Sequence, residues 1–229
     1  MGTIDILPRR LRGTSLEAPL AGLDRVYERI ETAQSSWIAA TPYSCPPGCG
    51  HCCETFEPDI LEIEALYLAA WIVRNAPERL ADVDRNADRV GCVLADHEGC
   101  YHCTVYPARP LVCRLFAYSG DRGKDGTVRF RPCAHMKVAG KRDLGQAELT
   151  ERYGMLPPVM GDLASEADLL LPGSAGERSP LREALPRAAA KIRLLTDLAA
   201  FSAFADAHDD GDGDNDNPGG NTPPLPRAG

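Results

Sequence analysis

The sequence predicts a mainly α-helical protein, with a small helical domain around a cysteine-rich, loop-heavy centre and at most a short hairpin. Three segments carry apolar residues at helical spacings of three and four, and no long run alternates apolar and polar residues as strands do. A chain of 229 residues can bury one core, so we expect a single domain over 16–205. A flexible lead (1–15) and a disordered acidic tail (206–229) should flank it.

Two helices are expected before the middle of the chain. The first runs from about Leu16 to Ala40, because its apolar residues share one face: Leu20, Leu23, Val26, Tyr27, Ile30 and Trp37. The second should begin at Asp59, which forms a capping-box pattern with Glu62, and should end at Pro77. Its broad apolar face is typical of a central, buried helix. A more polar helix is then expected over Pro77–Val90, with its charges facing solvent.

The next stretch is expected to be rich in loops. A hairpin is predicted around Asp96–Gly99, and a helical turn near Arg109-Pro110, because proline suits the first turn of a helix. Residues 119–126 are predicted to be a mobile loop, and Val128–Arg131 a short strand.

Two further helices complete the predicted domain. One covers Gln146–Tyr153, and a last long helix ends at about Ala205. From Asp206 onward the chain holds six Asp and one Arg, which is five of the eight net negative charges. This tail lacks apolar periodicity, so it is predicted to be disordered.

Composition excludes several classes of protein. The chain has 25 Lys and Arg against 33 Asp and Glu, which argues against a nucleic-acid partner. No apolar run is long enough to cross a bilayer, and Met1–Leu11 lacks the apolar segment of a secretory signal. We therefore expect a cytoplasmic protein without a membrane partner, in which thiols stay reduced.

The least probable stretch by composition is Cys45-Pro-Pro-Gly-Cys49-Gly-His-Cys52-Cys53, with four thiols in nine residues. Thiolates at this density in a reducing compartment typically bind a soft metal ion or an iron–sulfur cluster. A structural disulfide framework is the alternative. The spacing from Cys45 to Cys52 also matches that of radical adenosylmethionine enzymes, but the strand–helix repeats of those enzymes do not follow here.

The remaining cysteines complete a longer pattern. Cys92-Val-Leu is followed by Cys103-x2-Tyr106-x2-Arg109-Pro110-x2-Cys113-Arg114 and then by Cys133. Together with the first block, this arrangement resembles the CxxCxxCC cysteine-cluster family (YkgJ-like), whose members are generally described as zinc- or iron-chelating. The resemblance covers about 45–135. Two features depart from the family pattern: the first gap has three residues instead of two, and Cys100 is additional.

The resemblance implies a metal centre and leaves the reaction open. The expected ligands are Cys45, Cys49, Cys52, Cys53, Cys92, Cys103, Cys113 and Cys133. Four thiolates around a divalent ion leave a charge of −2, which Arg109 and Arg114 are placed to offset, so we expect these two and Tyr106 beside the cofactor. His51 is a ligand, a donor to a ligand or an exposed loop residue. One centre and two centres both remain open.

The implied cofactor is an iron–sulfur cluster, with 4Fe-4S favoured, or a zinc or iron ion. An iron–sulfur cluster is preferred because the ligands are thiolates without paired histidines. The expected role is redox, metal handling or an accessory function, with a protein partner left open. The alternative is a metalloenzyme that modifies a protein or a small molecule, for example by adenosylmethionine-dependent lysine N-methylation, because some relatives look like parts of protein-lysine methylases.

Overall fold

The computed structural model describes residues 11–96, 103–136, 138, 143–174 and 176–209, and it is mainly helical, as predicted. Two small antiparallel sheets accompany the helices, one of two strands and one of three. In chain order the elements are α1 (Glu17–Ala40), α2 (His51–Thr55), β1 (Asp59–Leu61), α3 (Glu62–Asn75), η3 (Pro77–Arg79), α4 (Leu80–Arg85), η4 (Tyr106–Ala108), α5 (Leu111–Leu115), β2 (Asp121–Arg122), β3 (Val128–Phe130), β4 (Leu144–Gly145), α6 (Gln146–Tyr153), α7 (Met160–Asp168), η5 (Pro172–Ser174), β5 (Arg178–Pro180) and α8 (Leu181–Asp209).

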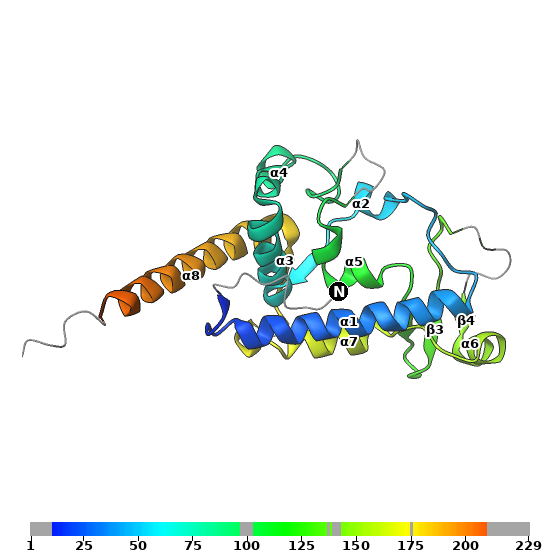
Figure 1. Cartoon of the computed structure of the whole chain (residues 1–229). Helices are drawn as coiled ribbons and strands as arrows, with labels where there is room; N and C mark the ends of the chain where they lie inside the picture. The colour runs from blue at the N-terminus through cyan, green and yellow to red at the C-terminus, as the bar shows by residue number, and fades with distance from the viewer. Residues whose placement is uncertain (1–10, 97–102, 137, 139–142, 175, 210–229) are drawn as a thin grey trace, which may run out of the picture.

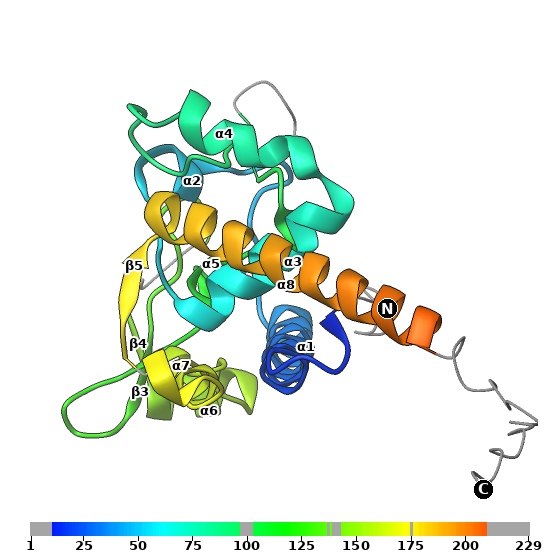
Figure 2. The ribbon, with the colours of Figure 1, turned by 90° about the vertical axis from the view of Figure 1, so that its left-hand side faces the viewer.

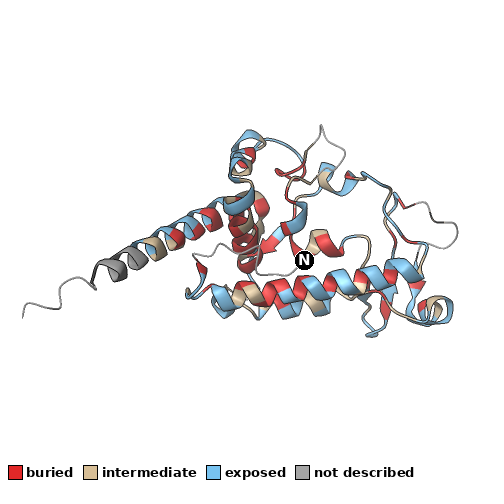
Figure 3. Cartoon of the chain, viewed as in Figure 1, coloured by how far each residue is buried: buried red, intermediate tan, exposed pale blue. Residues whose placement is uncertain are grey.

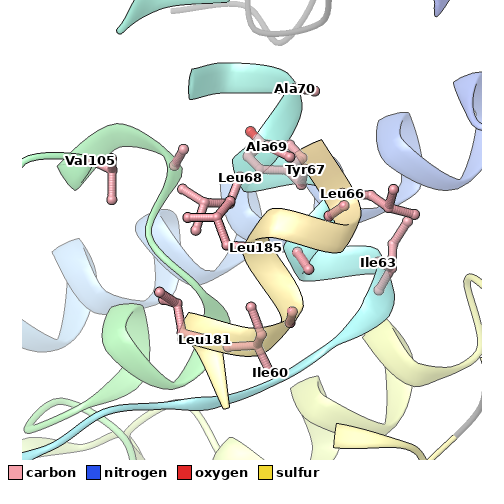
Figure 4. Close-up of a cluster of buried hydrophobic side chains, with 14 of the residues drawn as sticks. Ile60, Ile63, Leu66, Tyr67, Leu68, Ala69, Ala70, Val105, Leu181 and Leu185 are labelled. Atoms are coloured by element: carbon pink, nitrogen blue, oxygen red, sulfur yellow. The ribbon is translucent and has the colours of Figure 1, made fainter. Parts of the chain in front are cut away.

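The core is built around α3, which is buried on most of its surface because its apolar residues surround the helix (Figure 3). Helix α8 crosses α3 and projects beyond the rest of the fold (Figures 1 and 2). Leu68 of α3, Leu181 and Leu185 of α8, and Val105 from the second cysteine block all belong to this cluster (Figure 4). The main core therefore reaches the cysteine region directly.

A second, aromatic cluster lies at the other end of α1. Trp37 stacks on Tyr43 with ring centroids 6.1 Å apart, and Phe130 of β3 packs edge-on against both rings. Cys133 packs against this cluster. The three-stranded sheet β2-β3-β4 thus places the last predicted ligand beside the end of α1.

The predicted start of the central helix is wrong. Asp59 lies in β1, where it pairs with Pro180 of β5, so it cannot cap α3. Helix α3 begins at Glu62, and it is Glu64 whose side chain accepts the Leu61 N–H, at 3.0 Å. The strand was missed because its partner is more than a hundred residues away in the sequence.

Two other boundaries also differ. The polar helix predicted over Pro77–Val90 ends at Arg85, because the carbonyls of Ala87 and Arg89 accept hydrogen bonds from Arg182 instead of continuing the helix. The segment 119–126, predicted to be a loop, contains β2, which pairs with β3.

Other predicted elements are confirmed. Helix α1 begins one residue after the predicted start, α6 has the predicted bounds, and β3 occupies most of Val128–Arg131. Helix α8 runs four residues past Ala205 and continues through Pro186. Leu11, within the predicted lead, is buried in the main core. The predicted hairpin at Asp96–Gly99 and the tail from 210 lie largely outside the described residues.

Candidate metal centre

The first cysteine block is a turn followed by a short helix. The Cys49 N–H donates to the Pro46 carbonyl at 3.1 Å, and the intervening Gly48 has φ +70°, a conformation that favours glycine. The Cys45 N–H donates to the Tyr118 hydroxyl at 2.9 Å, which anchors the start of the block. Helix α2 then carries Cys52 and Cys53 on adjacent positions, with their sulfur atoms 3.9 Å apart.

Gly91 and Cys92 join the second block to the first. The Cys92 N–H donates to the Cys53 carbonyl at 3.0 Å. Gly91 has φ +88°, and a Cβ atom there would lie 2.4 Å from the Glu54 carbonyl oxygen and 2.5 Å from that of Cys53. Only glycine permits this approach of two backbones, so Gly91 is the residue that lets Cys92 reach the first block.

Cys103 and Cys113 are positioned by different contacts. Cys103 forms an antiparallel bridge with Ala95. Cys113 lies on α5, whose first N–H, that of Leu111, donates to Glu64 at 2.6 Å. Glu64 is almost fully buried on α3, so the central helix fixes the start of the helix that carries Cys113.

These thiols converge on one cavity of about 590 Å³. Seven of the eight predicted ligands line it: Cys45, Cys49, Cys52, Cys53, Cys92, Cys103 and Cys113. Cys133 does not line the cavity, but the ring of His135, two residues later, stacks on that of His51 in the first block. Cys100 lies outside the described residues.

Burial dominates the protonation of the inner thiols. It raises the pKa of Cys92 to about 11, and it also raises the pKa of Cys103 and that of Cys113. Cys52 is the exception, because a hydrogen bond from Cys53 lowers its pKa to about 6. A bound cation stabilises thiolates, so metal binding at these positions displaces protons.

Arg109 supplies positive charge to the cavity. Its guanidinium lies 4.0 Å above the ring of Tyr106, and its buried Nε has no hydrogen-bond partner among the residues that the structure describes. Its charge lowers the pKa of Cys52 and opposes the effect of burial at Cys103. Arg109 is therefore placed to offset the negative charge of a thiolate centre. Tyr106 supports the guanidinium and is itself more than half exposed.

Arg114 has a different set of contacts. Its guanidinium donates to the carbonyls of Arg109 and Pro107 at 2.9 and 2.5 Å and to Glu31 at 3.1 Å. It also lies 3.9 Å above the ring of Tyr27. All three of its nitrogens bond to protein oxygens, so Arg114 chiefly holds the segment that carries Arg109.

Sequence reasoning missed Arg182, which ties both cysteine blocks to α8. It donates to Glu57, which follows the first block, and to the carbonyls of Ala87, Arg89 and Gly91, which precede Cys92. One arginine at the start of α8 thus satisfies four groups from the two blocks. No local signal marks this role, because Arg182 is distant from both blocks in the sequence.

His51 and His135 lie at the outer edge of the cysteine region. Their rings are stacked, with centroids 4.0 Å apart and an interplanar angle of 16°. The Nδ1 atom of His51 lies 3.0 Å from a carboxylate oxygen of Glu54. Both rings are exposed, so neither is a packing residue of the core.

The donor set suits a soft metal, because sulfur atoms from four separate segments face one mostly apolar cavity. Within the described ranges, no three Cys, His, Asp or Glu side chains already have the arrangement of a closed metal site. Side-chain rotation is therefore needed for coordination, and several of the thiols line open space that allows it.

Comparison with known proteins agrees with this chemistry. Searches of curated proteins and of solved structures gave no match. The family model CxxCxxCC, described as a putative zinc- or iron-chelating domain, matches residues 44–136, the stretch that holds all eight predicted ligands. Residues 44–136 of this chain are therefore similar to the CxxCxxCC family.

Proposed function

We propose that this protein binds an iron–sulfur cluster, or a zinc or iron ion, through its clustered cysteines and serves a redox, metal-handling or accessory role. The observation that carries the proposal is the convergence of Cys52, Cys53, Cys92, Cys103 and Cys113 on one cavity. These five residues come from four segments of the chain, and few other uses of reduced thiols require such convergence. The proposal places the protein in the cytoplasm, where these thiols stay reduced.

Cys92, Cys103 and Cys113 would supply three ligands, with Cys52 or Cys53 as the fourth. The surroundings suit an iron–sulfur cluster because the inner ligands are all sulfur and the described residues that line the cavity include no histidine. Such a cluster supplies one-electron transfer when it is bound. Arg109 would stabilise the thiolates, and Tyr106 would hold its guanidinium in place.

Purification without oxygen tests the proposal. An iron–sulfur protein would be brown, would absorb near ~400 nm, and would contain iron and sulfide in equal amounts. Cys113→Ser should lose the inner metal, as should the double variant Cys52→Ser with Cys53→Ser, whereas Val112→Ser, in the same helix as Cys113, should keep it. Stoichiometric zinc in a colourless sample would remove the redox role, because zinc does not change oxidation state. Metal-free wild-type protein would overturn the proposal altogether.

The size of the cavity favours a second candidate. A volume of about 590 Å³ lies in the range of small-molecule sites, and the exposed pair Phe56 and Phe116 lies at its edge. A metalloenzyme that modifies a protein or a small molecule, with adenosylmethionine as methyl donor, would use such space. Calorimetric titration of the metal-loaded protein with S-adenosylmethionine tests this candidate, and the absence of binding removes the methyl-transfer branch.

A further inference from the structure

The predicted ligands divide by position into an inner and an outer group. The inner group consists of Cys52, Cys53, Cys92, Cys103 and Cys113, which line the cavity and suffice for one four-ligand centre. The outer group consists of Cys45, Cys49 and Cys133. Of these, Cys133 lies against the aromatic cluster and outside the cavity lining.

The three outer thiols come from segments that are held side by side. Tyr118, which packs against the aromatic cluster, accepts the Cys45 N–H at 2.9 Å. Cys133 packs against the same cluster, and the ring of His135, two residues later, stacks on His51. The aromatic cluster thus brings the segment that carries Cys133 beside the first cysteine block.

His51 has the arrangement expected of a metal-ligating histidine. Its Nδ1 lies 3.0 Å from the Glu54 carboxylate, and ligating histidines usually donate one ring N–H to a carboxylate and coordinate through the other nitrogen. The stacked ring of His135, 4.0 Å away, restricts the orientation of the His51 ring. His51 also lies between Cys49 and Cys52 in the sequence, next to the outer thiols.

We propose that Cys45, Cys49, Cys133 and Nε2 of His51 form a second metal site, specific for zinc, beside the inner thiolate centre. Three thiolates and one imidazole are an established set for structural zinc, and they leave a smaller net charge than four thiolates do. Rotation of the exposed Cys45 and His51 side chains would close the site. The inference rests on the proposed function, since it assumes that the inner thiols also bind metal.

The site would have a structural effect. Zinc there would connect the turn at 45–50 to the segment that follows β3, which no described backbone hydrogen bond joins. Cys45 and His51 are exposed, whereas Cys92 is buried, so a chelator should remove the outer zinc first.

Zinc titration of the reduced, metal-free full-length protein under anaerobic conditions tests the inference. We expect the wild type to bind two zinc ions per chain, and His51→Ala and Cys133→Ser to bind one each. His135→Ala, the matched control, removes a ring of the same kind that coordinates nothing and should retain two. Cys113→Ser should bind one ion at the outer site, and the double variant His51→Ala with Cys113→Ser should bind none.

The outcomes separate the two proposals. No zinc on any variant, together with no iron–sulfur cluster in the protein purified without oxygen, would overturn the proposed function. Equal zinc binding by the wild type and His51→Ala would overturn the outer site alone. X-ray absorption at the zinc edge gives a second measurement that does not depend on folding of a variant. The wild type should show a nitrogen ligand among the sulfurs, and a spectrum with sulfur ligands only would exclude His51.

Discussion

At the scale of single residues, the cysteine cavity depends on a few charged groups whose surroundings set their protonation. Arg109 has a buried nitrogen without a partner among the described residues, whereas Arg114 bonds to three protein oxygens. Glu64 is almost fully buried and accepts two backbone N–H groups. The sequence marks all three as charged, but only the fold separates the group that faces the cavity from those that hold the backbone.

Arg109→Met should make the Cys52 thiol less acidic. In the metal-free, reduced protein, alkylation of Cys52 should have a midpoint near the pKa of about 6, which hydrogen bonding from Cys53 and the Arg109 charge both lower. Loss of the charge should move the midpoint to higher pH. Peptide mass spectrometry of iodoacetamide-treated protein measures this, with Arg131→Met, an exposed arginine paired with Asp143, as control. An unchanged midpoint in Arg109→Met would contradict the assignment.

Glu64 should give the protein a stability that decreases with pH. Burial raises the Glu64 pKa, so the folded state holds this proton at pH values where the unfolded state has lost it. The free energy of unfolding should therefore fall as pH rises from the ordinary glutamate pKa through the raised one. Glu64→Gln should remove this part of the slope and cost about 1–3 kcal/mol, because the two backbone N–H groups bond to different oxygens of Glu64 and an amide has an acceptor at only one of these positions.

Glu62 provides a control of opposite sign. Its hydrogen bond with Lys191 lowers the Glu62 pKa, so its contribution to stability is present above the ordinary glutamate pKa and is lost as pH falls through the lowered one. Urea unfolding of Glu64→Gln and Glu62→Gln across pH measures both slopes. If the two variants change the slope in the same direction, the account of Glu64 is wrong.

At the scale of elements, the cavity is assembled by long-range backbone contacts between short pieces. The turn at Gly91 meets the end of α2, Ala95 bridges to Cys103, and α5 begins on Glu64 of α3. Helix α5 has five residues and α2 has five, so neither would be stable alone. Tertiary contacts, and not local propensity, hold the elements that carry the cysteines.

Gly91→Ala should destabilise the protein and the proposed metal site by more than the cost of placing alanine at a positive φ. The added methyl would overlap the carbonyls of Cys53 and Glu54, whereas Gly126→Ala, with φ +77° and open space, carries only the backbone cost of about 1–2 kcal/mol. We expect Gly91→Ala to exceed that cost and to lose bound metal, and Gly126→Ala to keep it. Urea unfolding and metal analysis of both proteins check this, and equal behaviour of the two variants would argue against the close approach.

The sequence predicts the long helices better than it predicts the pieces around the cavity. Helix α1 follows from periodicity, because it buries one continuous face. The strand β1 could not be predicted, since its partner β5 lies at the far end of the chain. The cysteines were recognisable as ligands from spacing, but their division between inner and outer positions depends on where the segment after β3 packs. The local sequence does not indicate the structural roles of Gly91 and Arg182, because these roles arise from contacts with distant segments.

At the scale of the whole molecule, the helical body holds the cysteine region from several sides. Helices α1 and α3 contact α5, while Arg182 and Leu181 of α8 reach the segments around Cys53 and Cys92. In the part of the chain that the structure describes, no helix is long and apolar enough to span a bilayer. Because the contacts from α1, α3 and α8 join the cysteine region to the helical core, metal binding and folding should be coupled across the molecule.

Removal of metal should lower global stability. At free metal a hundredfold above its dissociation constant, the bound state gains about 2.7 kcal/mol relative to the metal-free protein. A chelator added to the loaded protein should shift the urea midpoint down by a matching amount, and Cys113→Ser, which lacks the inner centre, should respond less. Coincident unfolding curves with and without chelator in the wild type would show that the cavity does not couple metal to folding.

The pairing of β1 with β5 limits how far the family segment can be treated as a portable module. Residues 44–136 carry the predicted ligands, but Ile60 pairs with Ser179, and Arg182 donates to the carbonyls of Ala87 and Gly91 within the segment. If the segment were excised, the apolar surface of α3 would lose its cover, and the Gly91 carbonyl would lose its hydrogen bond from Arg182. To move the cysteine segment into another protein, one would therefore have to include α1 and the start of α8, since the whole helical body supports the proposed metal site.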